Sequence, residues 1–135
     1  MILGLDYHNV ITANPKFFST LTKFLRVGQH EVHILTGSRK TSVLLNQLRE
    51  YGISWSHFFS ISDYHRSIGT PMTGYQEGQP KIDDELWNGT KAWYCQKNGV
   101  DLHIDDSPVY GRYFTTPYCQ YKHGTENDLF TFLRS

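Results

Sequence analysis

Acidic and hydroxyl side chains follow three apolar segments that have the composition of buried strands. Asp6 ends the run that begins at Ile2, Thr36 ends a second run, and Asp105 and Asp106 end a third. If the first and third runs are neighbouring parallel strands, their carboxylates converge at the carboxyl edge of the sheet, where such sheets bind ligands. Close carboxylates repel one another and are costly to bury. A hard divalent cation such as Mg²⁺, which prefers oxygen ligands, is therefore expected among them.

A hydroxyl and an ammonium group complete this chemistry. Thr36 would supply a hydroxyl with neighbouring backbone N–H groups, and Lys91, on the helix before the third run, would supply a positive charge. Lys81 and Lys97 are rivals for the second role, but Lys91 lies nearer the carboxyl edge than Lys97 does. Carboxylates, a hydroxyl, an ammonium and a divalent cation together make a phosphate site. A carboxylate beside Mg²⁺ can attack phosphorus and form an aspartyl-phosphate.

The elements that position these residues alternate between strand and helix. Strands are expected over residues 2–5, 31–35, 57–61, 100–104 and 118–121, and helices over about 15–27, 43–51, 84–98 and 125–133. This alternation predicts a three-layer, Rossmann-like α/β fold with a mostly parallel five-stranded sheet. The stretch 62–84 is rich in Gly and Pro and is expected to be a loop, flap or small cap. The short segment between Val10 and Pro15 leaves no room for a full cap domain.

Composition narrows the functional classes. The 135 residues, 39% hydrophobic and 15% aromatic, predict one compact domain over 1–135 rather than a disordered chain. The 13 basic and 13 acidic residues argue against a broad nucleic-acid-binding face. No apolar run has the length of a membrane helix, the N-terminus lacks a signal-peptide pattern, and two cysteines make no disulfide framework. A cytoplasmic protein with no membrane partner is expected.

Four segments, in order, resemble the motifs of the haloacid dehalogenase-like (HAD) superfamily. The first motif, an apolar strand followed by D-x-D-x-T/V, corresponds to ILGLDYHNVIT, and the second, a strand ending in Thr or Ser, to EVHILTGS. The third, a Lys on a helix, corresponds to NGTKAWYC, and the fourth, a strand ending in paired acids, to VDLHIDDS. The last segment is most similar to polynucleotide 3′-phosphatase domains and small deoxyribonucleotidases. The resemblance implies a sheet order of 5-4-1-2-3, counted over the five expected strands.

The resemblance also implies a role for each acidic residue. Asp6 would be the nucleophile and a Mg²⁺ ligand, and His8 would offer its backbone carbonyl to the metal. Asp105 would be the main ligand of the fourth motif, with Asp106 a ligand directly or through water.

The resemblance implies that residues of the second and third motifs bind the phosphate. Thr36 would bind the phosphoryl oxygens, and Lys91 would offset the charge of the phosphate. Gly37 and Ser38 belong to a loop that would cap the following helix and bind an anion at its N-terminus. Arg39 could contact a substrate phosphate or base, or simply be a solvated residue at the helix start.

One position departs from the family pattern. The family's phosphatases usually carry a second Asp two residues after the nucleophile, as general acid and base, and this chain has His8 there. A histidine can protonate a leaving oxygen, since its unperturbed pKa is about 6.5. The predicted function is a Mg²⁺-dependent phosphomonoester hydrolase. A phosphotransferase, a very slow phosphatase and a metal- or phosphate-binding protein without turnover are the alternatives.

Because no full cap domain is expected, the site should be open, and its openness affects which substrates and partners can reach it. An open site could admit a nucleic-acid end or a phosphoprotein, or a small molecule if a second subunit of a homo-oligomer closes over it. The histidines inside expected strands, His33 and His103, are expected to be core residues rather than zinc ligands, since neither shows close ligand spacing.

Overall fold

The structure is a computed structural model, and it describes residues 1–76 and 79–122. Five strands form one sheet: β1 (Ile2–Asp6), β2 (Glu31–Thr36), β3 (His57–Ser60), β6 (Leu102–Asp105) and β7 (Tyr118–Gln120). All the pairings in this sheet are parallel, whereas a mostly parallel sheet was expected. The α/β class and the Rossmann-like layering are confirmed. The expected helix over 125–133 lies outside the described residues.

The sheet runs in the order β3-β2-β1-β6-β7. The expected order, 5-4-1-2-3, carries different numbers because it counted five strands, whereas the described residues contain seven. The two additional strands, β4 (Gly74–Gln76) and β5 (Gln79–Lys81), form a separate antiparallel hairpin. When they are left out of the count, each strand of the sheet has the neighbours that were expected.

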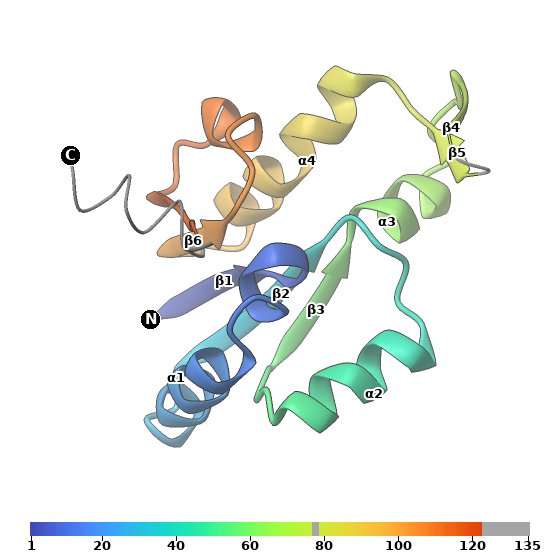
Figure 1. Ribbon diagram of the computed structural model, residues 1–135. Helices are drawn as coiled ribbons and strands as arrows, with labels where there is room; N and C mark the ends of the chain where they lie inside the picture. The colour runs from blue at the N-terminus through green and yellow to red at the C-terminus, as the bar shows by residue number, and fades with distance from the viewer. Residues whose placement is uncertain (77–78, 123–135) are drawn as a thin grey trace, which may run out of the picture.

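Helices cover both faces of the sheet (Figure 1). On one face lie α1 (Pro15–Val27) and α2 (Ser42–Tyr51); on the other lies α4 (Asp84–Lys97), with the short α3 (Ile61–Ser67) beside it at the end of β3. Asn14 starts α1, because its side chain accepts a hydrogen bond from Phe17 N and Pro15 takes the first helical position. Gly52 ends α2 in the left-handed conformation, at φ 74°.

Two apolar layers hold these helices to the sheet. The first lies between the sheet and the first two helices and includes Leu5, Val32, Ile34, Phe18, Leu44 and Leu48. The second lies under α4 and includes Leu35, Cys95 and Val100, with Phe59 and Tyr94 packed against them. Among the described helices, none combines the length and the apolar character that a membrane span requires.

The stretch 62–84 is more ordered than the expected loop. Most of α3 falls within it, capped by Ser60, whose hydroxyl oxygen accepts from Asp63 N, and the β4–β5 hairpin follows. Seven residues are too few for a helical period to stand out among the surrounding Gly and Pro residues. The hairpin lies beyond the carboxyl end of β3, beside α3 (Figure 1), so a small flap stands at the edge where ligands are expected.

Short turns follow two of the strands on the same edge. A helical turn over Tyr7–Ile11, interrupted at His8 and Asn9, comes directly after β1. A 3-10 turn over Tyr110–Tyr113 comes after β6.

Candidate metal and phosphate site

Three carboxylates meet at the carboxyl edge of the sheet. Strands β1 and β6 pair with Leu5 opposite Ile104, so the next residues, Asp6 and Asp105, come side by side. One oxygen each from Asp6, Asp105 and Asp106 lies within 4.8 Å of the others. Asp6 and Asp105 are buried, and Asp106 is partly exposed. This group offers oxygen ligands to a divalent cation, as hard cations prefer.

Lys91 lies between the two buried carboxylates. Its Nζ donates to Asp6 Oδ1 at 2.9 Å and to Asp105 Oδ2 at 2.7 Å, and its side chain is only 2% exposed. The rival lysines lie elsewhere: Lys81 pairs with Asp84, and Lys97 lies over a tryptophan ring of its own helix. Lys91 is therefore the lysine that this fold brings to the carboxylates.

The charges of Asp6, Lys91 and Asp105 balance only while Asp6 is protonated. Burial raises the pKa of Asp6 from 3.8 to about 8; the Lys91 ammonium opposes the shift and the charge of Asp105 adds to it. Burial would also raise the pKa of Asp105, but the hydrogen bond from His103 and the charge of Lys91 together hold that pKa below its usual value. Burial disfavours a charged Lys91, yet the two carboxylates prevail and raise its pKa. When Asp6 is ionised, two carboxylates with one ammonium leave one negative charge, which a cation would offset.

His103 supports Asp105 from the same strand. Residues two apart on a strand share a face, and His103 Nε2 lies 2.9 Å from Asp105 Oδ2. Burial lowers the pKa of His103, which favours a neutral ring that donates its Nε2 proton to the carboxylate. His103 Nδ1 is then a lone-pair nitrogen, and it has no hydrogen-bond partner among the described residues. The core assignment for His103 is confirmed; its contact with Asp105 was missed, although the spacing of two could have indicated it.

The loop after β2 forms a second wall of the site. Thr36 is buried, and its hydroxyl oxygen accepts from Ser38 N at 3.1 Å. A Cβ on Gly37 would lie 2.8 Å from the Trp87 ring, so only glycine lets the loop pass this close to α4. Gly37 and Ser38 line the same cleft as Asp6 and Lys91, whereas Thr36, predicted to bind the phosphoryl oxygens, is fully buried beneath this loop and does not line it.

His8 and Asn9 connect the turn after β1 to the other walls. His8 is exposed and lines the cleft, and its Nε2 lies 2.8 Å from Ser38 Oγ. Asn9 takes a left-handed conformation, at φ 60°, and its side-chain amide donates to Asp106 Oδ2 at 3.2 Å. The contact of Asn9 with the acidic pair was not predicted. That the backbone carbonyl of His8 is a metal ligand stays a prediction.

Arg39 stands apart from the carboxylates. Its Nε lies 3.4 Å from Asp63 Oδ1 on α3, while Lys40 N donates to the other oxygen of Asp63 at 2.8 Å. Arg39 still lines the cleft. The structure therefore places Arg39 on the wall of the cleft, paired with Asp63 rather than with the carboxylate cluster.

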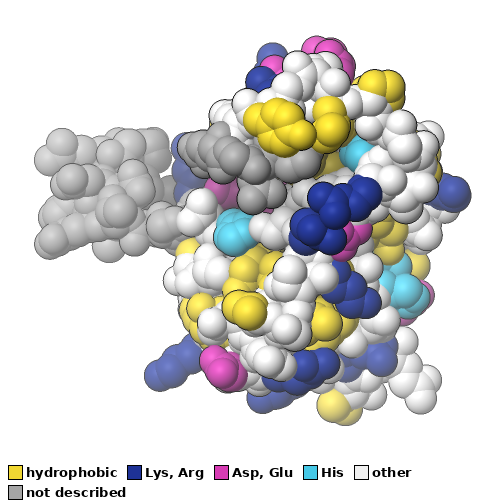
Figure 2. All heavy atoms as spheres, turned by 90° about the vertical axis from the view of Figure 1, so that its right-hand side faces the viewer, with side chains coloured by type: hydrophobic (Ala, Val, Ile, Leu, Met, Phe, Trp, Pro, Cys, Tyr) yellow, Lys and Arg dark blue, Asp and Glu magenta, His cyan; other side chains and the backbone are white. Residues whose placement is uncertain are grey.

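The cleft above this cluster is large. Its volume is about 1620 Å³, above the roughly 300–1,000 Å³ typical of small-molecule pockets. Asp6, Lys91 and Asp105 line it together with Arg66, Met72, Tyr75, Trp87 and Tyr110. In Figure 2, which looks onto the side of the molecule that carries the hairpin, Lys and Arg side chains lie near the middle of the face, with hydrophobic side chains above and below them.

No protein-family model matches this chain, and no curated protein matches it in sequence. The function is therefore inferred from the geometry of the cluster. A second group of ligand-type side chains, Glu31, His33 and His57, lies around the other end of β2 and does not touch this cleft.

Proposed function

We propose that the chain is a HAD-like phosphomonoester hydrolase that depends on Mg²⁺ and uses Asp6 as its nucleophile. One observation carries the proposal: a buried lysine joins two carboxylates at the carboxyl ends of adjacent parallel strands, beside a Thr-Gly-Ser loop. A buried carboxylate with a strongly raised pKa and a specific charge partner, on the wall of an open cleft, is a functional-site candidate.

The contacts of Asp6 suit it to attack. Its Oδ1 accepts from Tyr7 N at 2.9 Å and from Lys91 Nζ at 2.9 Å, and these two bonds fix the plane of the carboxylate. Oδ2 is then the oxygen that bonds to phosphorus while the bond to the leaving oxygen breaks. Asp6, Asp105, Asp106 and the backbone carbonyl of His8 would hold Mg²⁺, which offsets the charge of the phosphoryl group.

His8 completes the proton transfers. Its exposed ring stands beside Ser38 at the mouth of the cleft, where it gives a proton to the leaving oxygen in the first step. In the second step it takes a proton from the water that attacks the aspartyl-phosphate, and phosphate and free Asp6 result. Gly37 and Ser38 bind the phosphoryl oxygens, the buried Thr36 holds their loop by accepting from Ser38 N, and Lys91 stays protonated beside Asp6.

The size and the lining of the open cleft indicate which substrates fit it. Its volume exceeds that of a pocket for a small phosphate ester, and aromatic and basic side chains, among them Trp87, Tyr75 and Arg66, line it. A phosphorylated nucleic-acid end fits such a wall, because bases stack on aromatic rings and phosphates pair with arginine. A small phosphorylated molecule, with the site closed by a second copy of the chain, is the other fit.

The test is phosphate release from a panel that contains small phosphate esters and oligonucleotides with a 3′- or 5′-phosphate. Release should require Mg²⁺, cease in EDTA, and be lost in Asp6→Asn. Asp101→Asn is the matched control, because this exposed aspartate lies at the opposite edge of the sheet. Undiminished release by Asp6→Asn would refute the covalent mechanism.

The position of His8 favours one alternative, a protein that binds metal and phosphate without turnover. In this alternative the hydrogen bond to Ser38 holds the ring away from a leaving oxygen. On this alternative neither the wild type nor His8→Asp releases phosphate, although both bind Mg²⁺ in calorimetry. Release by His8→Asp alone would show that the site is intact and that His8 limits it.

A further inference from the structure

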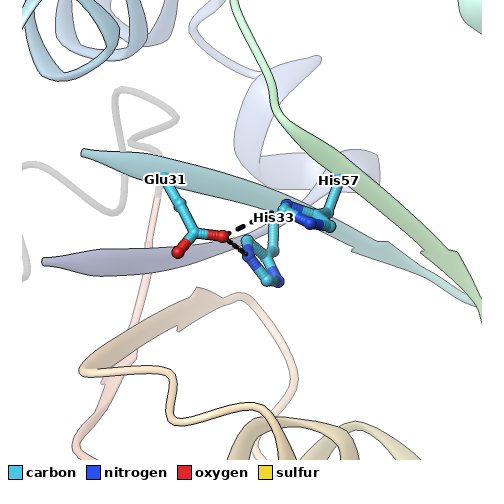
Figure 3. A group of neighbouring side chains, drawn as sticks. All are labelled: Glu31, His33 and His57. Atoms are coloured by element: carbon cyan, nitrogen blue, oxygen red, sulfur yellow. Dashed lines mark hydrogen bonds and ion pairs between the residues drawn. The ribbon is translucent and has the colours of Figure 1, made fainter. Parts of the chain in front are cut away.

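Two histidines and a glutamate share one face of the sheet at the start of β2 and β3 (Figure 3). Glu31 and His33 are two residues apart on β2, and His33 pairs in register with His57 on β3, so all three side chains stand on the same face. Their ligand atoms lie within 4.8 Å of one another. Imidazole nitrogens and a carboxylate are the donor set of many three-residue zinc sites.

The two distances from the Glu31 carboxylate to the histidine nitrogens are close to those around one small ion. Glu31 Oε1 lies 3.1 Å from His33 Nε2 and 3.4 Å from His57 Nδ1. Two ligands bound at about 2.1 Å to a tetrahedral Zn²⁺ lie about 3.4 Å apart. The carboxylate oxygen therefore already stands at nearly the separation from each imidazole that a shared metal requires.

A hydrogen bond between the second ring nitrogen and Tyr94 fixes the orientation of His33. Without a metal, Nε2 donates to Glu31 Oε1 and Nδ1, 2.8 Å from the Tyr94 hydroxyl on α4, accepts from it; when Nε2 binds a metal it gives up this proton, and Nδ1 can then carry a proton and donate to Tyr94. Histidines that bind metals are held in this way, by a hydrogen bond to the other ring nitrogen. His33 is 4% exposed, whereas Glu31 and His57 are 41% and 52% exposed, so one side of the cluster is open to water.

We propose that Glu31, His33 and His57 form a site for a transition-metal dication, with Zn²⁺ as the best fit. His33 Nε2, His57 Nδ1 and Glu31 Oε1 are the ligands, and water takes the open position. Without the ion, His57 Nδ1 lies 3.1 Å from Ser56 Oγ, and metal binding replaces this hydrogen bond. Imidazole selects Zn²⁺ over Mg²⁺, whose sites are built from oxygen atoms. The bound ion ties the start of β2 to the start of β3, at the opposite end of β2 from Thr36. This site is independent of the phosphatase proposed for the carboxyl edge.

The test is isothermal titration with Zn²⁺ in a buffer that contains excess Mg²⁺, together with NMR spectra of the histidine ring nitrogens. One equivalent of Zn²⁺ should bind and shift the ring nitrogens of His33 and His57. His57→Ala and Glu31→Gln, each of which removes one proposed ligand, should weaken binding more than about 100-fold. Tyr94→Phe should weaken it about 10- to 100-fold, the usual cost of losing a partner behind a ligand.

Two controls separate this site from the acidic cluster. His8→Ala removes an exposed histidine at the carboxyl edge, and Asp106→Asn removes a carboxylate of the other group. Both variants should bind Zn²⁺ as the wild type does. The proposal is overturned if no Zn²⁺ binds, if His57→Ala and Glu31→Gln bind it with unchanged affinity, or if Asp106→Asn abolishes binding.

Discussion

Asp6→Asn should stabilise the metal-free protein at neutral and alkaline pH, although it removes the proposed nucleophile. Burial raises the pKa of Asp6 from 3.8 to about 8, so the folded protein resists its ionisation. Asparagine has nearly the same shape and keeps the oxygen that accepts from Tyr7 and Lys91. At about 1.4 kcal/mol per pKa unit, the gain in the free energy of unfolding is on the order of 5 kcal/mol above pH 8.

The pH dependence of this difference is fixed by linkage. The folded pKa of Asp6 lies above the unfolded one, so its contribution to stability is fully present below about pH 3.8 and is lost as the pH rises to about 8. Asparagine does not titrate. The two proteins should therefore have equal stability near pH 4, and the variant should gain on the wild type up to about pH 8. Mg²⁺ should reduce this difference in stability between the two proteins, because the cation offsets the charge of ionised Asp6.

Urea unfolding in EDTA, at about pH 4 and about pH 8.5, measures this difference directly. Glu50→Gln is the matched control, because it removes an exposed carboxylate on α2, outside the acidic cluster, and should change the unfolding free energy by less than about 0.5 kcal/mol. If Asp6→Asn is no more stable than the wild type at the higher pH, Asp6 is not a strained carboxylate and the charge argument for a bound cation fails.

Three further variants test other parts of the site. Lys91→Met leaves two buried carboxylates without their partner and should lower the unfolding free energy by about 3–5 kcal/mol in urea; unchanged stability would contradict the ion pair. Gly4→Ala places a Cβ 2.6 Å from His103 Nδ1 and should lower the unfolding free energy by about 1–3 kcal/mol, seen as a lower melting temperature. His8→Ala should reduce phosphate release about 10²- to 10⁴-fold with no change in melting temperature; an equal rate would remove His8 from the mechanism.

Much of the site could be predicted because it depends on strand ends. The apolar runs that end at Asp6 and Asp105 mark strands without any knowledge of their partners, and parallel pairing then brings these ends to one edge. The choice of Lys91 over Lys97 followed from its place on the helix. The geometry of the cluster agrees with these predictions, while the catalytic roles stay predictions.

Other features depend on contacts across the sheet and could not be predicted. Glu31 and His33 meet His57 only because β2 and β3 pair in one register, and a shift of one residue would turn His57 to the other face. Asn9 reaches Asp106 through a turn with a left-handed residue. The hairpin and α3 are too short for their periods to stand out among turn residues.

Mass spectrometry of the protein quenched in acid during turnover tests the central claim most directly. With Mg²⁺ and a phosphomonoester from the panel that it hydrolyses, the account predicts a phosphoryl group on the peptide that contains Asp6. It should be absent in EDTA and in Asp6→Asn. Phosphate release with no phosphoryl group on Asp6, or with the group on another residue such as His8, would contradict the account.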